Sequence, residues 1–330
     1  MARPVLIFVS ILAALFAFVY QLHLKPILTA LGVGRVIQAV GNDACFSVPD
    51  LQACESQCQC FPAQYNISLA NTRSAEIVLH QPTGILYLAC STPGSRVHWT
   101  PAADRLNSAG RSTNDYVATY DPSTSLITRL KFSDVPGTRG LSLHGMDVVP
   151  SAQNTNELFV YLVNHRVPLQ GDSRHIGADS SIEVFRTSVG SSVLTHIRTV
   201  EDPLVILTPN DIVGSSDGRS FFFTNDHGEK TGIVSASDFF LNIHWNNIWR
   251  QKRYLDVLGR KSTSVGFCHV EDGCKFAITG MHASNGIARA QNDTFYVANV
   301  LGGPLSVLER QDDNSLVLTD LISVGQYAEM

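Results

Sequence analysis

The chain has 330 residues, of which 44% are hydrophobic and 16% charged, and its formal net charge is −5. This length suffices to bury a large core, either in one big all-β domain or in two smaller domains. The acidic balance, together with a sequence that contains no run of Lys and Arg, excludes nucleic-acid binding as the main role.

The N-terminus carries an apolar segment, residues 4–20, that contains no charged side chain. Its length lies between that of a signal peptide's apolar region and that of a full membrane span. We expect residues 1–24 to form a signal peptide or a retained signal-anchor helix, with the anchor favoured, and residues 25–44 to form a linker. Either form places the rest of the chain in the secretory pathway, anchored in a membrane and facing the lumen or outside, or secreted.

The seven cysteines suit an oxidising compartment, in which disulfides persist. Four of them cluster near the N-terminus, at Cys45, Cys54, Cys58 and Cys60. A zinc site is the alternative, but this cluster lacks the paired C-x2-C units that are typical of zinc. We therefore expect disulfides for most of the cysteines, in a pairing that the sequence leaves open.

Two Asn-x-Ser/Thr triplets begin at Asn66 and Asn292. This triplet is the acceptor for N-glycosylation, although it also occurs by chance, and it predicts a lumenal or extracellular surface. Asn66 falls within residues 56–75, a polar, cysteine-containing segment that interrupts the surrounding β pattern. We interpret this segment as an atypical insert.

From residue 45 to residue 330 the sequence consists of short β-rich runs separated by turns of Gly, Asn, Asp and Pro. A turn followed by an aromatic and β-branched strand recurs at residues 82–90, 156–165, 217–227 and 292–300. This pattern predicts an all-β sandwich, barrel or propeller. The repeats are farther apart than the ~40–50 residues of a usual propeller blade, so we expect long insertions or an unrecognised blade between them. Beyond the N-terminus, only residues 238–254 suggest a helix.

The stretch TPNDIVGSSDGRSFFFTNDH, at residues 208–227, places polar side chains at both ends of a β-rich run. Asn210 and Asp211 stand near its start, and Asp226 and His227 close it. An Asn-Asp pair after proline is a common turn former, which is the structural alternative for this motif. Amide and carboxylate oxygens are hard ligands that suit calcium better than zinc or copper. The stretch therefore predicts a calcium site.

Three further motifs carry related chemistry: LHGM at residues 143–146, VNH at 163–165 and SNGI at 284–287. His144 and His165 would supply imidazoles, which can take a proton from water near neutral pH. Asn285 would supply another amide oxygen, although Asn-Gly is also a hairpin-turn signal. A calcium ion that polarises a carbonyl beside such a base gives ester or lactone hydrolysis as one natural use. A serine nucleophile is disfavoured, because the sequence contains no G-x-S-x-G motif.

The motifs LHGM, VNH, PNDIV, TNDH and SNGI, in this order and at these intervals, resemble the paraoxonase/arylesterase family of calcium-dependent lactonases and esterases. The resemblance extends from about Cys54 to Arg310. It implies a six-bladed β-propeller with two calcium ions in its central tunnel, one catalytic and one structural, and an N-terminal hydrophobic helix. The family's next Asp and Asn ligands would follow about where this chain ends. We therefore expect a fungal-like, C-terminally truncated member with incomplete last blades.

The resemblance also implies a set of metal ligands. Asn210 and Asn285 would bind the catalytic calcium, whereas Asp211 would bind the structural calcium with the backbone carbonyl of Met146 beside it. The family's acidic doublet on the first inner strand corresponds to two glutamates that the atypical insert separates, Glu55 and Glu76. We interpret the insert as a retained intron or a species-specific loop, and in the second case we expect only one of the two glutamates to reach the metal.

By the same resemblance, His144 and His165 correspond to the family's histidine dyad, which is proposed to deprotonate the attacking water. Asp226 and His227 correspond to a pair near the tunnel, and we treat them as a possible site. Structural roles are expected for three other histidines, His80, His196 and His269.

The sequence thus predicts an extracytoplasmic β-propeller that binds calcium and hydrolyses a small-molecule ester or lactone. The alternative is a calcium-stabilised binding scaffold without activity, or a truncated pseudoenzyme, which the missing final ligands favour. A strictosidine-synthase-like propeller is a third interpretation, but it would not need the LHGM and VNH pair. The expected partners are the substrate and, through the N-terminal segment, a membrane.

Overall fold

A computed structural model of the chain describes residues 2–25, 28, 33–34, 45–46, 48, 50–54, 59–60, 77–135, 139–231, 261–301 and 303–323. Several predicted features lie outside these residues. They are the helix at residues 238–254, most of the insert at residues 56–75, the sequon at Asn66, and the two acidic candidates Glu55 and Glu76.

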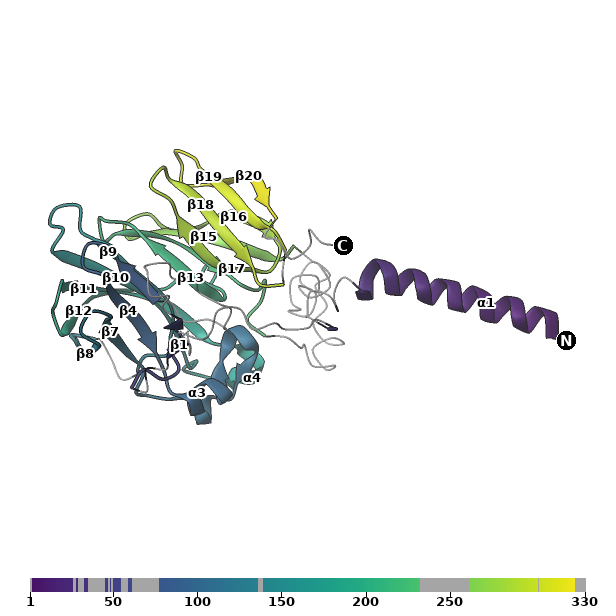
Figure 1. The fold of residues 1–330 in the computed structure, drawn as a ribbon, viewed down its shortest axis with the longest axis horizontal. Helices are drawn as coiled ribbons and strands as arrows, with labels where there is room; N and C mark the ends of the chain where they lie inside the picture. The colour runs from purple at the N-terminus through teal and green to yellow at the C-terminus, as the bar shows by residue number, and fades with distance from the viewer. Residues whose placement is uncertain are drawn as a thin grey trace.

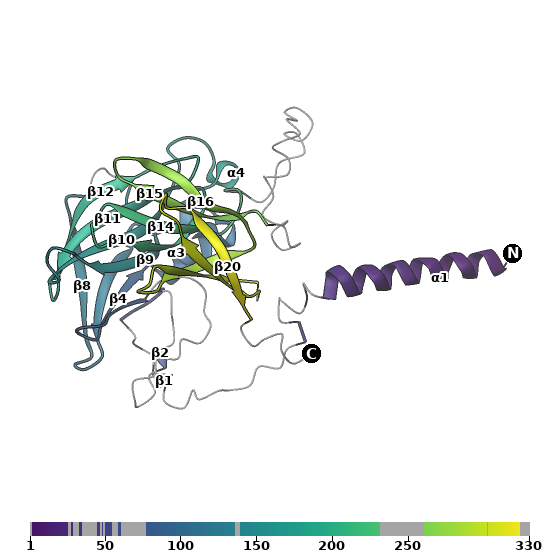
Figure 2. The same ribbon diagram turned by 90° about the horizontal axis from the view of Figure 1, so that it is seen from above.

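The N-terminal segment forms helix α1 (Ala2–Val19), which continues as the π-helical turn η1 (Tyr20–Leu24). In both views α1 projects away from the β-rich part of the molecule (Figures 1 and 2). The window Pro4–Leu22 spans 19 residues, is wholly exposed, and is long and apolar enough to cross a membrane. A signal sequence at the N-terminus has the same properties, so the choice between anchor and signal peptide stays a prediction.

The β-rich part begins with two antiparallel four-stranded units. Unit 1 consists of β3 (Ile77–His80), β4 (Ile85–Cys90), β7 (Tyr116–Asp121) and β8 (Leu126–Ser133). Unit 2 consists of β9 (Leu143–Pro150), β10 (Glu157–Arg166), β11 (Asp179–Ser188) and β12 (Val193–Val200). The last strands of the two units, β8 and β12, pair in parallel and join the units into one eight-stranded sheet.

Two more four-stranded antiparallel units follow, and the order from unit 1 to unit 4 runs from blue to yellow in Figure 1. Unit 3 consists of β13 (Pro209–Gly214), β14 (Ser220–Asn225), β15 (Thr263–His269) and β16 (Gly273–Met281). Unit 4 consists of β17 (Ser284–Arg289), β18 (Thr294–Asn299), β19 (Leu305–Arg310) and β20 (Leu316–Ile322). Each repeat that the sequence predicted contributes the second strand of one unit. Among the described residues, no further four-stranded unit lies between these repeats, and the 25-residue connection between β4 and β7 lengthens the first interval.

Shorter elements lie in the connections and near the N-terminus. They are β1 (Cys45–Phe46), β2 (Gln59–Cys60), α3 (Pro93–His98), β5 (Trp99–Thr100), η3 (Pro101–Ala103), β6 (Arg105–Leu106), η4 (Ser108–Gly110) and α4 (Ser173–Ile176). The sequence predicted no helix in these connections, because six residues are too few to show a helical period. The local signals are present for α3: the Thr92 side chain accepts a hydrogen bond from Ser95 N, and Pro93 occupies the first turn.

The hydrophobic core lies between successive units. Along β14, Phe221 and Phe223 pack toward unit 2, whereas Phe222 packs toward unit 4. This alternation follows the two-residue period of a strand. The Phe222 ring lies 4.6 Å from the ring of Phe295 on β18, centroid to centroid. Both faces of a middle unit are therefore covered, which explains why its strands are nearly continuous apolar runs.

The first strands of the units lie side by side, with β13 between β9 and β17, and β9 also in contact with β3. Four-stranded antiparallel units arranged around their first strands are the architecture of a β-propeller. The expected fold class, an all-β propeller with an N-terminal hydrophobic helix, is confirmed. The described residues contain four units, and a total of six blades stays a prediction.

Two disulfides confirm the expectation that most cysteines pair. Cys54 bonds to Cys90 at the end of β4, and Cys268 bonds to Cys274 across the β15–β16 hairpin. Within the part of the chain that the structure describes, no group of three or more His, Cys, Asp and Glu side chains is arranged to hold a metal ion.

Candidate functional site

The candidate site lies where the inner strands of units 2, 3 and 4 begin. His144 is the second residue of β9, Asn210 is the second residue of β13, and Asn285 is the second residue of β17. Because these strands lie side by side, equivalent positions bring together side chains that are far apart in the sequence. The motifs LHGM, PNDIV and SNGI therefore meet at one end of the inner strands.

The backbones of β9 and β13 approach so closely here that a side chain would not fit between them. A Cβ added at Gly145 would lie 2.2 Å from the backbone oxygen of Asn210 and 2.8 Å from the Cα of Asp211. No real Cβ atom tolerates the first of these distances. The glycine of LHGM therefore has a packing role that allows His144 and Asn210 to come into contact.

Asn210 joins the histidine to a carboxylate. Its Nδ2 lies 3.2 Å from His144 Nε2 and donates to Asp226 Oδ2 at the same distance. The carboxylate only accepts hydrogen bonds, so it fixes the amide nitrogen on this side. His144 Nε2 must then be the acceptor of the second amide hydrogen, and the imidazole carries its proton on Nδ1.

His144 and His165 form a buried pair, with 1% and 2% of their surfaces exposed. Their ring centroids are 5.1 Å apart and their planes make an angle of 73°. Ser180 Oγ lies 2.9 Å from His165 Nδ1, and the indole of Trp99 donates to the backbone oxygen of His165 at 3.0 Å. The His144 pKa is well below its ordinary value, mainly because burial disfavours the charged form, with smaller electrostatic contributions from His165 and Arg96 in the same direction. His144 is therefore a neutral imidazole at neutral pH.

Asp211 links the inner strands of units 3 and 4. Its Oδ1 accepts from Ile212 N at 2.6 Å, and its Oδ2 accepts from Ile287 N at 2.7 Å. A second connection runs through Thr224, which accepts from Asp211 N at 3.2 Å and donates to the backbone oxygen of Asn285 at 2.5 Å. The Thr224 hydroxyl thus bridges the backbones of Asp211 and Asn285.

The two polar residues of the TNDH motif lie close to each other, with His227 Nε2 3.8 Å from Asp226 Oδ2. Asp226 is buried against Asn210, and its Oδ1 has no hydrogen-bond partner among the described residues. His227 Nε2 also lies 3.0 Å from the backbone oxygen of Ala102, in the β4–β7 connection. A buried carboxylate oxygen without a partner is costly, so Asp226 is a candidate cation ligand, whereas His227 links the site to that connection.

The donors at this site fit calcium better than a softer metal. Asn210, Asn285, Asp211 and Asp226 offer amide and carboxylate oxygens, which are hard ligands, and the unpartnered oxygen of Asp226 adds an acceptor that a cation could satisfy. Met146, whose backbone carbonyl is another candidate, is fully buried on β9. These are expectations for a bound ion.

A cavity of about 10 Å³ adjoins His165. Its lining residues are Pro101, Ala102, His165, Ala178, Ser180, Leu207, Thr208, Asp226 and Lys230. A space of this size holds about one water molecule.

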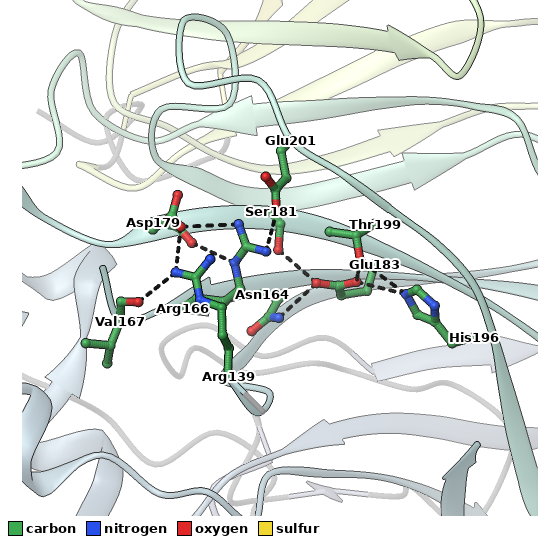
Figure 3. A network of polar contacts seen from close by, with 10 residues as sticks. All are labelled: Arg139, Asn164, Arg166, Val167, Asp179, Ser181, Glu183, His196, Thr199 and Glu201. Carbon is green, nitrogen blue, oxygen red and sulfur yellow. Dashed lines mark hydrogen bonds and ion pairs between the residues drawn. The ribbon is translucent and has the colours of Figure 1, made fainter. Parts of the chain in front are cut away.

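Glu183, for which no site role was predicted, lies at the centre of a hydrogen-bond network with Asn164, Ser181, His196 and Thr199 (Figure 3). This buried carboxylate accepts from Asn164 Nδ2 at 3.0 Å and from Thr199 Oγ1 at 2.6 Å. It also receives the Ser181 hydroxyl at 2.8 Å and lies 3.0 Å from His196 Nε2. Burial raises its pKa, but the hydrogen bonds outweigh burial and leave the pKa below its ordinary value.

A signal for Glu183 was present in the sequence. The strand SIEVFR places one acidic residue in an otherwise buried run, and a buried charge requires partners. The expected structural role of His196 agrees with its place in this network. His80 and His269 also make local contacts, with Thr83 and Asp272 respectively.

The structure thus combines a propeller of four-stranded units with a buried histidine pair beside amide and carboxylate groups at the inner strands. A family model described as Arylesterase matches residues 121–329, and the chain belongs to this family.

Curated relatives agree with the family. The chain is 25% identical over 198 residues to "Serum paraoxonase/arylesterase 2" of Canis lupus familiaris, covering 58% of this chain and 47% of that protein. It is 25% identical over 190 residues to "Serum paraoxonase/lactonase 3" of Mus musculus, covering 57% and 45%. The chain therefore spans about half the length of the curated relatives it matches.

The chain has lower sequence identity to the solved structures that it resembles. The periplasmic gluconolactonase of Pseudomonas aeruginosa is 10% identical, with a TM-score of 0.41, over 84% of this chain and 66% of that one. A structure described as a putative gluconolactonase is 9% identical, with a TM-score of 0.38, over 76% and 64%.

Proposed function

We propose that this protein hydrolyses small-molecule esters or lactones with the help of calcium. The observation that carries the proposal is the buried cluster of His144, Asn210 and Asp226, in which a neutral imidazole and a carboxylate contact the same amide group. The family to which the chain belongs supports this reaction class. The disulfides and the apolar N-terminal helix fit the secretory pathway, and attachment to a membrane through that helix is part of the proposal.

Two calcium ions would be held by the oxygen donors of the inner strands. Asn210 and Asn285 would hold the catalytic ion, and Asp211 with the carbonyl of Met146 would hold the structural ion. Either Glu55 or Glu76 would complete the set from the first inner strand. When bound, calcium would polarise the substrate carbonyl and stabilise the oxyanion that forms when water attacks it.

His144 and His165 would carry out the proton transfers of the reaction. His144 Nε2 carries the lone pair of the ring and accepts from Asn210 Nδ2 in this structure. If Asn210 turned its amide oxygen toward a bound calcium, this hydrogen bond would break and Nε2 would take a proton from a water molecule there. His165, whose ring is 5.1 Å away and is oriented by Ser180, would stabilise the resulting charge and pass the proton toward the leaving alkoxide. The carbonyl carbon gains the water oxygen and loses the alkoxide, so the products are an acid and an alcohol, or one hydroxy acid from a lactone.

Hydrolysis of phenyl acetate and of a δ-lactone by the full chain, with and without calcium, tests this function. We expect calcium-dependent turnover that falls by at least about 100-fold in His144→Gln, since a positioned general base contributes roughly 10²–10⁴-fold. His175→Gln, at an exposed histidine on α4, should leave turnover unchanged.

A calcium-stabilised scaffold without activity is the second candidate, because the cavity beside His165 holds only about one water. Calcium binding without turnover of either substrate would contradict the hydrolase proposal and favour the scaffold.

A further inference from the structure

The backbone immediately before His144 is held on every side by hydrogen bonds. Ser142 N donates to Asn164 Oδ1 at 2.9 Å, and Ser142 O accepts from His165 N at 2.8 Å. Leu143 N donates to Asp115 Oδ2 at 2.9 Å, and Leu143 O accepts from Arg96 Nη2 at 2.8 Å. The β9–β10 pairing shifts register at this point, between Leu162 and Asn164, so side chains replace the regular ladder.

The two bonds to Leu143 come from unit 1, because Asp115 directly precedes β7 and Arg96 belongs to α3 in the β4–β7 connection. Since β9 is the edge strand of its sheet, its outward backbone groups have no strand partner. Asp115 supplies the acceptor and Arg96 supplies the donor that a neighbouring strand would otherwise provide. We define these two side chains, bonded to the two polar groups of Leu143, as the Leu143 clamp.

Asp115 is itself firmly held. It is buried, and the Ser91 hydroxyl donates to its second oxygen at 2.7 Å. Ser91 follows Cys90, the partner of Cys54 in a disulfide, and its backbone nitrogen donates to Ala53 O at 3.2 Å. A continuous set of bonds therefore runs from the disulfide through Ser91 and Asp115 to the residue before His144.

Arg96 also supports the other half of the clamp. Burial raises the pKa of Asp115, and the positive charge of Arg96 acts against this rise by favouring the ionised carboxylate. Arg96 thus bonds Leu143 O directly and stabilises the carboxylate that accepts from Leu143 N.

We infer that Arg96 and Asp115 are positioning residues for the histidine dyad, which set the place of the His144 ring relative to Asn210 and His165 through the Leu143 backbone. This inference rests on the proposed hydrolase function for its kinetic consequences. The position of the His144 ring, which the clamp sets, can be tested without any measurement of turnover. A displacement of about 1 Å in a catalytic group can cost roughly 100-fold in rate, so small losses of order at Leu143 should be measurable.

Asp115→Ala and Asp115→Asn separate positioning from general stability. Alanine removes the acceptor of Leu143 N, whereas asparagine can still accept from Leu143 N with its oxygen and donate to Ser91 Oγ with its nitrogen. With phenyl acetate, we expect kcat to fall about 10-fold to 100-fold in Asp115→Ala at nearly unchanged KM, and to recover to within about 5-fold of the wild type in Asp115→Asn. Equal losses in both variants, or a loss in KM alone, would overturn the inference.

Arg96→Gln provides the second variant should Asp115→Ala fail to fold, because Arg96 is only partly buried. Its control is Arg174→Gln, which removes an exposed arginine paired with Asp172 on α4. We expect a fall in kcat of about 10-fold or more for Arg96→Gln and a change within about twofold for Arg174→Gln.

Imidazole NMR of the calcium-loaded full chain in detergent micelles gives a readout that needs no turnover. The nitrogen signals of His144 should move in Arg96→Gln while those of His269, on the outer part of unit 3, stay in place. Unmoved His144 signals in a folded variant would refute the clamp. An inactive wild type with moved signals would refute the proposed function and leave the clamp intact.

Discussion

Asn210 is the central residue of the candidate site, because its amide contacts both His144 on β9 and Asp226 after β14. That contact requires a glycine at position 145, where β9 passes over the backbone of β13. The amide nitrogen faces both partners, so its oxygen lies outside these two bonds. A cation at this centre would compete with His144 and Asp226 for the orientation of one amide group.

Gly145→Ala tests this close approach. The added methyl group would lie 2.2 Å from Asn210 O, so the two strands must separate, and overpacking of this kind typically costs about 1–3 kcal/mol. We expect a lower free energy of unfolding in urea. We also expect esterase activity to fall by more than the fraction of unfolded protein accounts for. Gly94→Ala on α3, where a Cβ meets nothing within 4 Å, should be neutral or slightly stabilising. Equal behaviour of the two variants would contradict the packing role of Gly145.

Glu183→Gln tests the network behind the histidines. Glutamine offers one oxygen where the carboxylate receives four polar groups, so we expect a loss of roughly 3 kcal/mol in the free energy of unfolding at pH 7. Because the pKa of Glu183 is depressed in the folded state, its contribution is present above the unfolded pKa of about 4.5 and disappears as the pH falls through the folded value. The difference between wild type and variant should therefore shrink below pH 4.5.

Urea unfolding at pH 7 and at pH 3.5 measures this effect. Glu157→Gln is the matched control, because Glu157 lies on the neighbouring strand and pairs with Arg186 at 3.7 Å near the surface. Such a pair contributes about 0–1 kcal/mol. A Glu183 variant as stable as the Glu157 variant at pH 7 would show that the network is dispensable.

At the scale of elements, the two disulfides constrain loops of very different length. Cys54 and Cys90 are 36 residues apart, whereas Cys268 and Cys274 are 6 apart. Chain-entropy reasoning gives a larger stabilisation for the longer loop, about 4 kcal/mol against about 2 kcal/mol. The Cys54–Cys90 disulfide also connects the segment before Glu55 to the end of β4.

Paired alanine substitutions test this ranking. We expect Cys54→Ala with Cys90→Ala to lower the urea midpoint more than Cys268→Ala with Cys274→Ala does, because the longer loop gains more freedom when its bond is removed. The first pair should also reduce activity, since Ser91 and Asp115 lie on the path from Cys90 to the histidine strand. The opposite ranking of the two midpoints would contradict the loop-length argument.

The strands themselves differed in how well the sequence predicted them. The second strand of each unit is rich in aromatic and β-branched residues and was recognised from that pattern. The inner strands β9, β13 and β17 were recognised only as motifs, because glycine, asparagine and histidine interrupt the apolar alternation at their starts. The short helices of the β4–β7 and β10–β11 connections were missed, since their stability comes from caps and contacts and not from a periodic face.

For the whole molecule, the sequence predicted the fold class and the motifs of the centre, but not the framework that holds them. His144, Asn210 and Asn285 stood out because their residue types occur in short, specific motifs. Arg96, Asp115 and Glu183 did not, because their roles depend on contacts between residues 19 to 47 positions apart in the chain. A single sequence contains no information on those distances until the propeller arrangement is known.

The central claim concerns one point in this architecture: the starts of the inner strands form a calcium centre beside a histidine pair. A crystal structure of the full chain grown with calcium tests it most directly. We predict an ion with the side-chain oxygens of Asn210 and Asn285 at about 2.3–2.6 Å, the usual range for calcium, and His144 and His165 close by. Density without an ion at these side chains, or calcium bound only at the molecular surface, would contradict the account.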